Sequence, residues 1–182
     1  KNGDIRLCID YRKLNTMIVK DAHPLPNIDA TLQGLMDKKV FSLMDMQSGF
    51  WQIPMEEESK KKTAFATLEN HYEFSVLPFG LCVSPAVFQR QMQAILRDEL
   101  TKSEKDRRVF CYIDDVLIAT HTMEEHFELL ERVVERFEQS GMKLNARKCT
   151  IAVPKLQYLG HTVSAEGVSM DADKVKAIKE YP

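Results

Sequence analysis

The chain has no apolar run long enough to cross a membrane, and it has no cluster of histidine and cysteine residues with the spacing of a zinc site. Its four cysteines, Cys8, Cys82, Cys111 and Cys149, lie far apart in the sequence. Three of them lie in apolar strand-like or turn contexts, so we expect small core residues in a reducing compartment and not a disulfide framework. Internal repeats and low-complexity segments are also missing. What is left is an ordinary globular chain without a membrane partner.

An excess of one charge is missing as well, because 25 Lys and Arg residues nearly balance 27 Asp and Glu residues, giving a net charge of −2. Nothing in the overall charge therefore indicates a nucleic-acid partner, and any basic surface has to be local. Local basic clusters exist at residues 60–62, 107–108 and 147–148, although each alone is equally consistent with a solvated face. With 182 residues, 44% of them hydrophobic, the chain can form one domain with a sizeable core.

The most informative segment is Tyr112-Ile113-Asp114-Asp115, which lies between two short apolar runs at residues 109–111 and 116–119. The β-branched and aromatic residues of these runs predict two strands, and Asp-Asp is a natural turn between them. Two adjacent carboxylates in an otherwise buried strand pair are costly unless a cation compensates them. Such a hairpin could hold a divalent metal, but it could equally be a turn with solvated aspartates.

Asp45 adds a third carboxylate, near the end of another apolar run at residues 41–46. Taken alone, an aspartate there is more often a strand terminator or a helix cap. Two strands that each deliver a carboxylate to one edge would instead form a site for a hard cation such as magnesium or manganese. Paired metals about 3.5–4 Å apart can activate an attacking hydroxyl and stabilise a leaving phosphate oxygen.

Strands and helices are predicted in mixed order along the chain. Strands are expected at residues 5–10, 41–46, 50–55, 63–67 and 72–76, with further hairpins at 109–119 and 156–163. A short helix is expected at residues 28–36, and residues 97–108 have the composition of a charged connection. Strand pairs that alternate with helices predict an α+β domain in which an antiparallel sheet is backed by helices.

Two long helices have clear start and stop signals. The first is predicted to begin with Ser84 as N-cap and Pro85 at the first helical position. The second is predicted to begin at a capping box formed by Thr122 and Glu125 and to end at Gly141. Apolar stripes at helical spacing should face the sheet in both: Phe88, Met92, Ile95 and Leu96 in the first, and Phe127, Leu130, Val134 and Phe137 in the second.

Short motifs throughout the chain resemble a known family. They are Asp10-Tyr11-Arg12-Lys13-Leu14-Asn15, Pro24-Leu25-Pro26, Phe41-Ser42-Leu43-Met44-Asp45, Lys62-Thr63-Ala64-Phe65, His71-Tyr72-Glu73-Phe74, Leu77-Pro78-Phe79-Gly80-Leu81, Ser84-Pro85-Ala86-Val87-Phe88-Gln89, the Tyr-Ile-Asp-Asp box, Lys143-Leu144-Asn145 with Lys148-Cys149, and Tyr158-Leu159-Gly160-His161. In this order and approximate spacing they resemble the fingers and palm of a reverse transcriptase, most closely those of gypsy-type long-terminal-repeat retrotransposons.

The resemblance covers essentially the whole chain and implies a polymerase palm with partial fingers. Residues 1–40 and 56–82 would be mainly fingers, residues 41–55 and 83–165 mainly palm, and residues 166–182 the start of the connection to a thumb. Asp45, Asp114 and Asp115 would be the catalytic carboxylates that bind Mg²⁺ or Mn²⁺, with Asp45 and Asp114 as direct ligands. This fits phosphoryl transfer, which needs charge neutralisation and in-line positioning more than covalent help from the protein.

The resemblance also implies residues that bind the nucleotide and the primer. Lys1, Arg6, Phe79, Gly80 and Lys148 would lie around the incoming nucleotide, and Tyr112, Leu159 and Gly160 at the primer terminus. Phe50 would lie under the sugar and exclude a 2′-hydroxyl. From the residues alone, Arg6 is equally an exposed cation on a strand and Phe50 a core aromatic. Retroviral members carry glutamine at the position of Phe79.

The sequence thus predicts an RNA-directed DNA polymerase that extends a primer on an RNA or DNA template with dNTPs. Because the chain begins with Lys1 and stops at Pro182 just after a helix-like segment, we expect a part of a longer Pol polyprotein that also carries a thumb and a ribonuclease H. The resemblance implies a cytoplasmic location in virus-like particles.

Two alternatives stay open. One is a folded but inactive nucleic-acid-binding remnant of a decayed element, against which the intact Asp45, Asp114 and Asp115 argue. The other is an RNA-dependent RNA polymerase, which shares the logic of the palm. Phe50, with the Leu-Pro-Phe-Gly and Tyr-Leu-Gly motifs, favours the enzyme that makes DNA.

Overall fold

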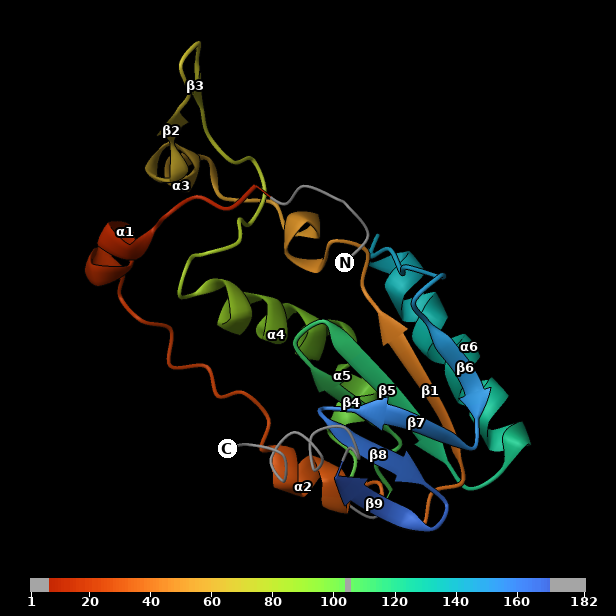
Figure 1. The fold of residues 1–182 in the computed structure, drawn as a ribbon. Helices are drawn as coiled ribbons and strands as arrows, with labels where there is room; N and C mark the ends of the chain where they lie inside the picture. Colours follow the sequence, from red (N-terminus) through yellow and green to blue (C-terminus); the bar gives the residue numbers. More distant parts are fainter. Residues whose placement is uncertain (1–6, 104–105, 171–182) are drawn as a thin grey trace, which may run out of the picture.

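A four-stranded antiparallel sheet forms the centre of the computed structural model, which describes residues 7–103 and 106–170 (Figure 1). The strand order is β4-β5-β1-β6, with β4 at Val109–Tyr112, β5 at Asp115–Thr120, β1 at Val40–Asp45 and β6 at Thr150–Val153. Residues on β1, β4 and β5 are almost all buried, because both faces of the sheet are covered. The predicted strand at residues 41–46 and the predicted hairpin at 109–119 are both confirmed.

Helices cover one face of this sheet. They are α4 (Ser84–Ile95), α5 (Arg97–Leu100) and α6 (Met123–Gln139). Because side chains alternate along a strand, Met44, Val116 and Ile118 point to this face and pack on Phe88 and Leu129. Residues 97–108 were predicted as a charged connection, and their first four residues form the short helix α5. No helix in the described part of the chain is both long enough and apolar enough to cross a membrane.

The opposite face is covered by α2 (Ile28–Gln33) and by a second, three-stranded sheet (Figure 1). Its strands are β7 (Lys155–Tyr158), β8 (His161–Ser164) and β9 (Gly167–Met170). Phe41, Phe110 and Leu117 of the central sheet pack here against Tyr158 and Val163. The hairpin predicted at residues 156–163 is confirmed, and β9 extends it by one strand.

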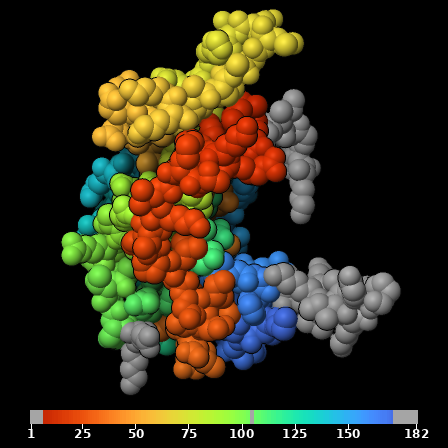
Figure 2. All heavy atoms as spheres, turned by 90° about the vertical axis from the view of Figure 1, so that its left-hand side faces the viewer, coloured from red at the N-terminus to blue at the C-terminus, as the bar shows by residue number. Residues whose placement is uncertain are grey.

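The remaining elements stand apart from the central sheet at the top of Figure 1. They are α1 (Arg12–Met17), α3 (Glu57–Lys60), the 3-10 helix η2 (Lys61–Thr63) and the short hairpin of β2 (Phe65–Ala66) and β3 (His71–Tyr72). Tyr11 joins them, because its hydroxyl donates a 2.9 Å hydrogen bond to the carbonyl of Thr63. Figure 2 shows the segment from residue 7 through α2 running across one face of the molecule, from this region to the lower end of the central sheet.

Some predicted elements are wrong. Residues 50–55 form no strand, because η1 (Gly49–Gln52) is a 3-10 helix and only Pro54 makes an isolated bridge, with Val76. Residues 7–10 have no regular structure, and the rest of the predicted strand at 5–10 lies outside the described residues. Ser84 is not the N-cap of α4, since Val83 takes that position and the Ser84 hydroxyl donates to the carbonyl of Pro78.

The predicted core stripe of α6 is only partly correct, because Phe137 is buried and Leu130 packs against the core, but the other two residues are exposed. The buried residues are His126, Leu129, Val133 and Phe137, whereas Phe127 is 53% exposed and Val134 is 40% exposed. The buried face therefore lies one residue towards the N-terminus for three of its four members, and it includes the polar residue His126. The ends of α6 were predicted correctly: the Thr122 side chain accepts from the Glu125 amide, and Gly141, at φ 71°, ends the helix with the amide of Met142 bonded to the carbonyl of Phe137.

His126 can be buried because each of its ring nitrogens has a partner. Its Nδ1 lies 2.9 Å from the Thr120 hydroxyl, which itself donates to the carbonyl of Thr122, so Nδ1 must be the protonated nitrogen. Nε2 then accepts from the Ser42 hydroxyl at 2.6 Å, and the amide of Ala152 donates to that same hydroxyl oxygen at 2.8 Å. This chain of hydrogen bonds joins β1, β5, β6 and α6 inside the core.

We predict that Ser42→Ala lowers the free energy of unfolding by about 1–3 kcal/mol, because the ring of His126 and the amide of Ala152 would both lose a buried partner. Urea denaturation of both proteins measures the difference. Ser169→Ala, at an exposed position of β9, is the control and should change the unfolding free energy by less than about 0.5 kcal/mol. Equal stability of Ser42→Ala and the parent would show that the network contributes nothing.

Candidate active site

The hairpin of β4 and β5 turns one residue earlier than predicted. Tyr112 pairs with Asp115, so the two turn residues are Ile113 and Asp114, and Asp115 is already the first residue of β5. Ile113 has φ 53°, a left-handed conformation that is strained for a β-branched residue. The turn therefore needs support from its surroundings.

Gln89 of α4 supplies that support. Its side chain is fully buried, and its Oε1 accepts a 2.7 Å hydrogen bond from the amide of Ile113 while its Nε2 donates to the carbonyl of Cys111 at 3.2 Å. One amide side chain thus holds both ends of the strained turn. Gln89 is part of the motif at residues 84–89, but no role was predicted for it. The signal in the sequence was a glutamine between the apolar residues Phe88 and Met92 on the face of the helix predicted to pack on the sheet.

The pairing of β1 with β5 brings the third carboxylate to the same place. Asp45 lies directly opposite Asp115 in the antiparallel register, and Asp114 comes immediately before Asp115, in the turn that leads into β5. Gly49 packs against this group, since a Cβ built on it would lie 2.5 Å from Oδ1 of Asp114 and 3.0 Å from the Phe88 ring. Only glycine leaves room for Asp114 there. Gly49 is thus a second positioning residue, and it was not predicted from the sequence.

These carboxylates repel one another in a partly buried environment. Burial raises the pKa of Asp114 to about 6, and the charges of Asp115 and Asp45 add to the effect. Burial and Asp45 also raise the pKa of Asp115. Lys148 is the nearby opposing charge, with its Nζ 3.6 Å from Oδ1 of Asp45, which is within ion-pair range but longer than a hydrogen bond.

The site has unused coordination capacity for a cation. Oδ1 of Asp45 and Oδ1 of Asp114 are both buried without a hydrogen-bond partner. Within the described residues, however, no three His, Cys, Asp or Glu side chains already stand close enough to hold one metal ion. The unpartnered oxygens fit a hard divalent cation, because such ions can be bound by one or two carboxylates and complete their shell with water and substrate phosphates.

The aromatic residues beside the acids form one cluster. The ring centroid of Phe50 lies 5.2 Å from that of Phe79 and 5.5 Å from that of Phe88, and Trp51 contacts Phe79 edge-on at 5.7 Å. Phe50 is half-buried and packs against the core beneath α4, so one side of it is structural and the other is accessible. This position is compatible with both interpretations of Phe50.

Gly80 has a backbone conformation and a close neighbour that favour glycine at this position. Its φ is 93°, and an added Cβ would lie 3.1 Å from the carbonyl of Ile9. The side chain of Asn15 bridges the loop, because Nδ2 donates to the carbonyl of Gly80 and Oδ1 accepts from the amide of Cys82, both at 2.9 Å. Lys1 and Arg6, predicted to bind the nucleotide, lie outside the described residues.

The predicted primer residues lie at two neighbouring turns. Leu159 and Gly160 form the two-residue turn between β7 and β8, with φ of 49° and 76°. Tyr158 before them is buried with its hydroxyl unpartnered, and burial, followed by the nearby Cys111, Asp115 and Tyr112, raises its pKa. The turn residues thus follow a tyrosine that lies within electrostatic range of the acidic hairpin.

The chain is similar to several known proteins. Residues 1–163 match the family model described as "Reverse transcriptase (RNA-dependent DNA polymerase)". In Drosophila melanogaster, the chain is 40% identical over 177 residues to the retrovirus-related Pol polyprotein from transposon 297, covering 97% of this chain and 16% of that protein. It is 38% identical over 183 residues to that from transposon opus, covering 100% of this chain and 18% of that protein.

The Pol polyprotein from transposon gypsy is 35% identical over 181 residues, which cover 100% of this chain and 17% of that protein. The chain therefore spans less than a fifth of the length of the curated relatives it matches. Among solved structures, the foamy viral protease-reverse transcriptase in complex with an RNA/DNA hybrid has the same fold, with a TM-score of 0.85 and 24% identity, covering 97% of this chain and 23% of that chain. The native prototype foamy virus protein gives a TM-score of 0.74 at 28% identity, covering 87% and 21%.

We predict that Asp114→Asn stabilises the metal-free protein at pH 7.5. The folded-state pKa of about 6 lies above the ordinary value of 3.8, so the ionised carboxylate opposes folding at neutral pH. The gain should shrink as the pH falls through 6 towards 4, because Asp114 is then protonated and neutral in the folded parent. Melting temperatures measured with a chelator present test this, with the exposed Glu73→Gln as control. A lower melting temperature of Asp114→Asn at pH 7.5 would contradict it.

Proposed function

This chain belongs to the reverse transcriptase family, and from that premise we propose that it is the polymerase part of a longer retrotransposon polyprotein. In the proposed activity it extends a primer with dNTPs on an RNA or DNA template. One observation carries the proposal: Asp45, Asp114 and Asp115 meet at one end of two paired strands, and two of their buried oxygens have no hydrogen-bond partner. A merely structural set of aspartates would be expected to have hydrogen-bond donors around it.

In the proposed site, Asp45 and Asp114 bind Mg²⁺ or Mn²⁺ directly, and Asp115 adds negative charge beside them. Bound metal ions would activate the primer hydroxyl and stabilise charge on the leaving phosphate oxygen. Gln89 and Gly49 position Asp114, the former through the turn and the latter by leaving it space. The raised pKa values of Asp114 and Asp115 support this assignment, because a divalent cation would relieve the repulsion that causes them.

The reaction is an in-line displacement at the α-phosphorus. The primer 3′ oxygen forms a bond to phosphorus, and the bond to the pyrophosphate oxygen breaks. Lys148 is 61% exposed at its side chain and lies beside Asp45, so its ammonium can contact the triphosphate and give a proton to the leaving pyrophosphate. Lys148 thus lies next to the acids themselves.

The surrounding elements suggest how substrates are held. The elements around α1, α3, β2 and β3 would act as fingers, the central sheet with α4 and α6 as palm, and Leu159-Gly160 with Tyr112 as the seat of the primer end. Phe50, Phe79 and Gly80 would border the nucleotide. A thumb and a ribonuclease H would come from the remainder of the polyprotein, which would act in cytoplasmic virus-like particles.

We predict that Asp114→Asn abolishes primer extension by several orders of magnitude, because it removes a metal ligand while keeping the shape of the side chain. Extension of a labelled primer on an RNA template, by the polyprotein polymerase with and without the substitution, measures the effect. Asp98→Asn, an exposed site on α5, is the control. Activity within a few-fold of the parent would overturn the site, whereas an inactive parent that still binds primer-template would identify the chain as a remnant.

We predict that Phe50→Val raises incorporation of ribonucleotides strongly while deoxynucleotide incorporation falls only modestly. A ring against the sugar leaves no volume for a 2′-hydroxyl, and valine would open that volume. The ratio of kcat/KM for a deoxynucleotide to that for its ribonucleotide is the measurement. Phe137→Val, a buried substitution in α6, controls for lost packing. If the ratio is unchanged and Phe50→Val costs about 1–4 kcal/mol of stability, the ring is packing only.

A further inference from the structure

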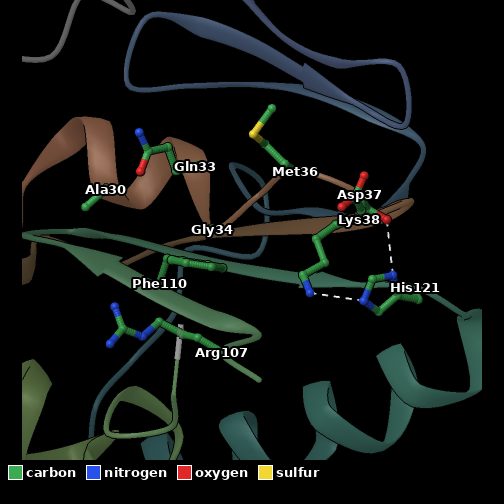
Figure 3. A pocket seen from close by; sticks show the side chains of 9 residues that line it. All are labelled: Ala30, Gln33, Gly34, Met36, Asp37, Lys38, Arg107, Phe110 and His121. Atoms are coloured by element: carbon green, nitrogen blue, oxygen red, sulfur yellow. Dashed lines mark hydrogen bonds between the residues drawn. The ribbon is translucent and has the colours of Figure 1, made fainter. Parts of the chain in front are cut away.

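A pocket of about 520 Å³ opens at the end of the central sheet that lies away from the acids (Figure 3). In the β1–β5 register, Val40 pairs with Thr120 at this end, and Asp45 pairs with Asp115 at the other. Five residue steps along a strand amount to about 17 Å, so this pocket is separate from the proposed active site. Its lining includes Gln33 and Met36 near α2, Lys38 before β1, Arg107 and Phe110 around the start of β4, and His121 after β5.

Lys38 is an unusually buried lysine, because the whole residue is only 4% exposed. Its Nζ lies 3.1 Å from Nε2 of His121, and Nδ1 of His121 lies 3.1 Å from the carbonyl of Asp37 (Figure 3). Nδ1 therefore donates and Nε2 accepts, which makes the histidine neutral. In the described part of the chain no carboxylate lies within ion-pair distance of Lys38, and Glu125 is paired with Arg108 instead.

The carboxylates that act on Lys38 do so without forming an ion pair with it. Glu125 accepts from the Arg108 side chain at 2.7 Å and from the His121 amide at 3.2 Å. Burial lowers the pKa of Lys38, and the positive charge of Arg108 lowers it further, whereas Glu125, Asp37, which also lines the pocket, and Asp106 oppose the shift. The pocket is thus built around a cation that its own surroundings disfavour.

Arg107 brings a second cation to the same pocket. It is half-buried, and its Nε is fully buried without a hydrogen-bond partner. Arg107 also lines a neighbouring pocket of about 550 Å³, together with Arg90 and Arg97 of α4 and α5. A buried donor without a partner and a buried ammonium without a counterion both carry a desolvation cost that a bound anion would remove.

We propose that Lys38 and Arg107 form a binding site for a phosphate group at this end of the sheet. The guanidinium offers paired donors that match phosphate oxygens, and the ammonium acts as a point charge. The phosphate can come from a free phosphate or nucleotide, or from a nucleic-acid backbone. The site does not depend on the proposed polymerase activity.

Titration of the chain with inorganic phosphate tests the site, at constant ionic strength and with a chelator present. Isothermal calorimetry should give saturable binding. Lys38→Met and Arg107→Met each keep an apolar stem and should weaken the affinity by about ten-fold or more, because each removes a charge-assisted bond. Lys39→Met, an exposed lysine on the same segment, is the matched control and should stay within about two-fold. Equal affinity of Lys38→Met and the parent would overturn the proposal.

The backbone amides of two glycines locate the binding. Gly34 lines the pocket and Gly49 packs against Asp114, so NMR titration with phosphate should shift the amide signal of Gly34 and leave that of Gly49 in place. A shift of Gly49 alone would overturn the proposal. If Lys38 served only to hold His121, Lys38→Met would lower the melting temperature and leave the phosphate-induced shift of Gly34 unchanged, which also overturns it.

Competition distinguishes the two sources of phosphate. A short duplex without terminal phosphates is added to the phosphate-bound chain, and the Gly34 signal is followed. The same experiment is made with Lys39→Met, which should behave as the parent does. Displacement by the duplex assigns the site to a nucleic-acid backbone, and persistence of the phosphate-bound signal assigns it to a free phosphate or nucleotide; both outcomes require the Lys38-dependent binding described above.

Discussion

The antiparallel pairing of β1 with β5 is the constraint on which both the core and the site depend. In this register Met44 lies opposite Val116 and faces the helices, while Leu43 lies opposite Leu117 and faces the second sheet. The same register sets Asp45 opposite Asp115. Because side chains alternate along a strand, a slip of one residue would move the side chains of each face of β1 to the opposite face of the sheet. It would also separate Asp45 from Asp115. Burial of the apolar residues on both faces therefore also fixes the position of the carboxylates.

The central sheet carries charge of opposite sign at its two ends. At one end, Asp45 and Asp114 have buried oxygens without a hydrogen-bond partner, and at the other, Lys38 is buried without an ion pair in the described residues and Arg107 has a buried Nε without a hydrogen-bond partner. Such groups reduce stability unless a ligand satisfies them. The core network of Ser42, His126 and Thr120 behaves differently, because each of its polar atoms has a partner within the protein. Complete internal satisfaction is typical of structural polar groups, and its absence at the ends of the sheet is what points to ligands.

Much of the fold followed from local patterns. The family resemblance and the α+β architecture are confirmed by the match to the reverse transcriptase model and by the foamy viral structures. The errors occurred where tertiary contacts override local preference. Residues 50–55 have strand composition, but the 3-10 helix η1 forms instead, and the Gln52 side chain bonds to the carbonyls of Gln47 and Lys143. The stripe of α6 was partly misassigned because His126 is buried by partners on two strands, Ser42 of β1 and Thr120 of β5, which no helical periodicity reveals.

The sequence by itself determined the residue types of the site and their order: acids at the ends of apolar runs, a capped helix between two hairpins, and motifs typical of one family. Only the tertiary structure decided that Asp115 belongs to a strand, that Gln89 supports the strained Ile113, and that Gly49 must lack a side chain. It also decided that Lys38 and Arg107, 69 positions apart in the sequence, line one pocket. The physical reason is that strand, turn and helix preferences are local, whereas close approach, burial and the loss of a counterion depend on chain segments that meet only after folding.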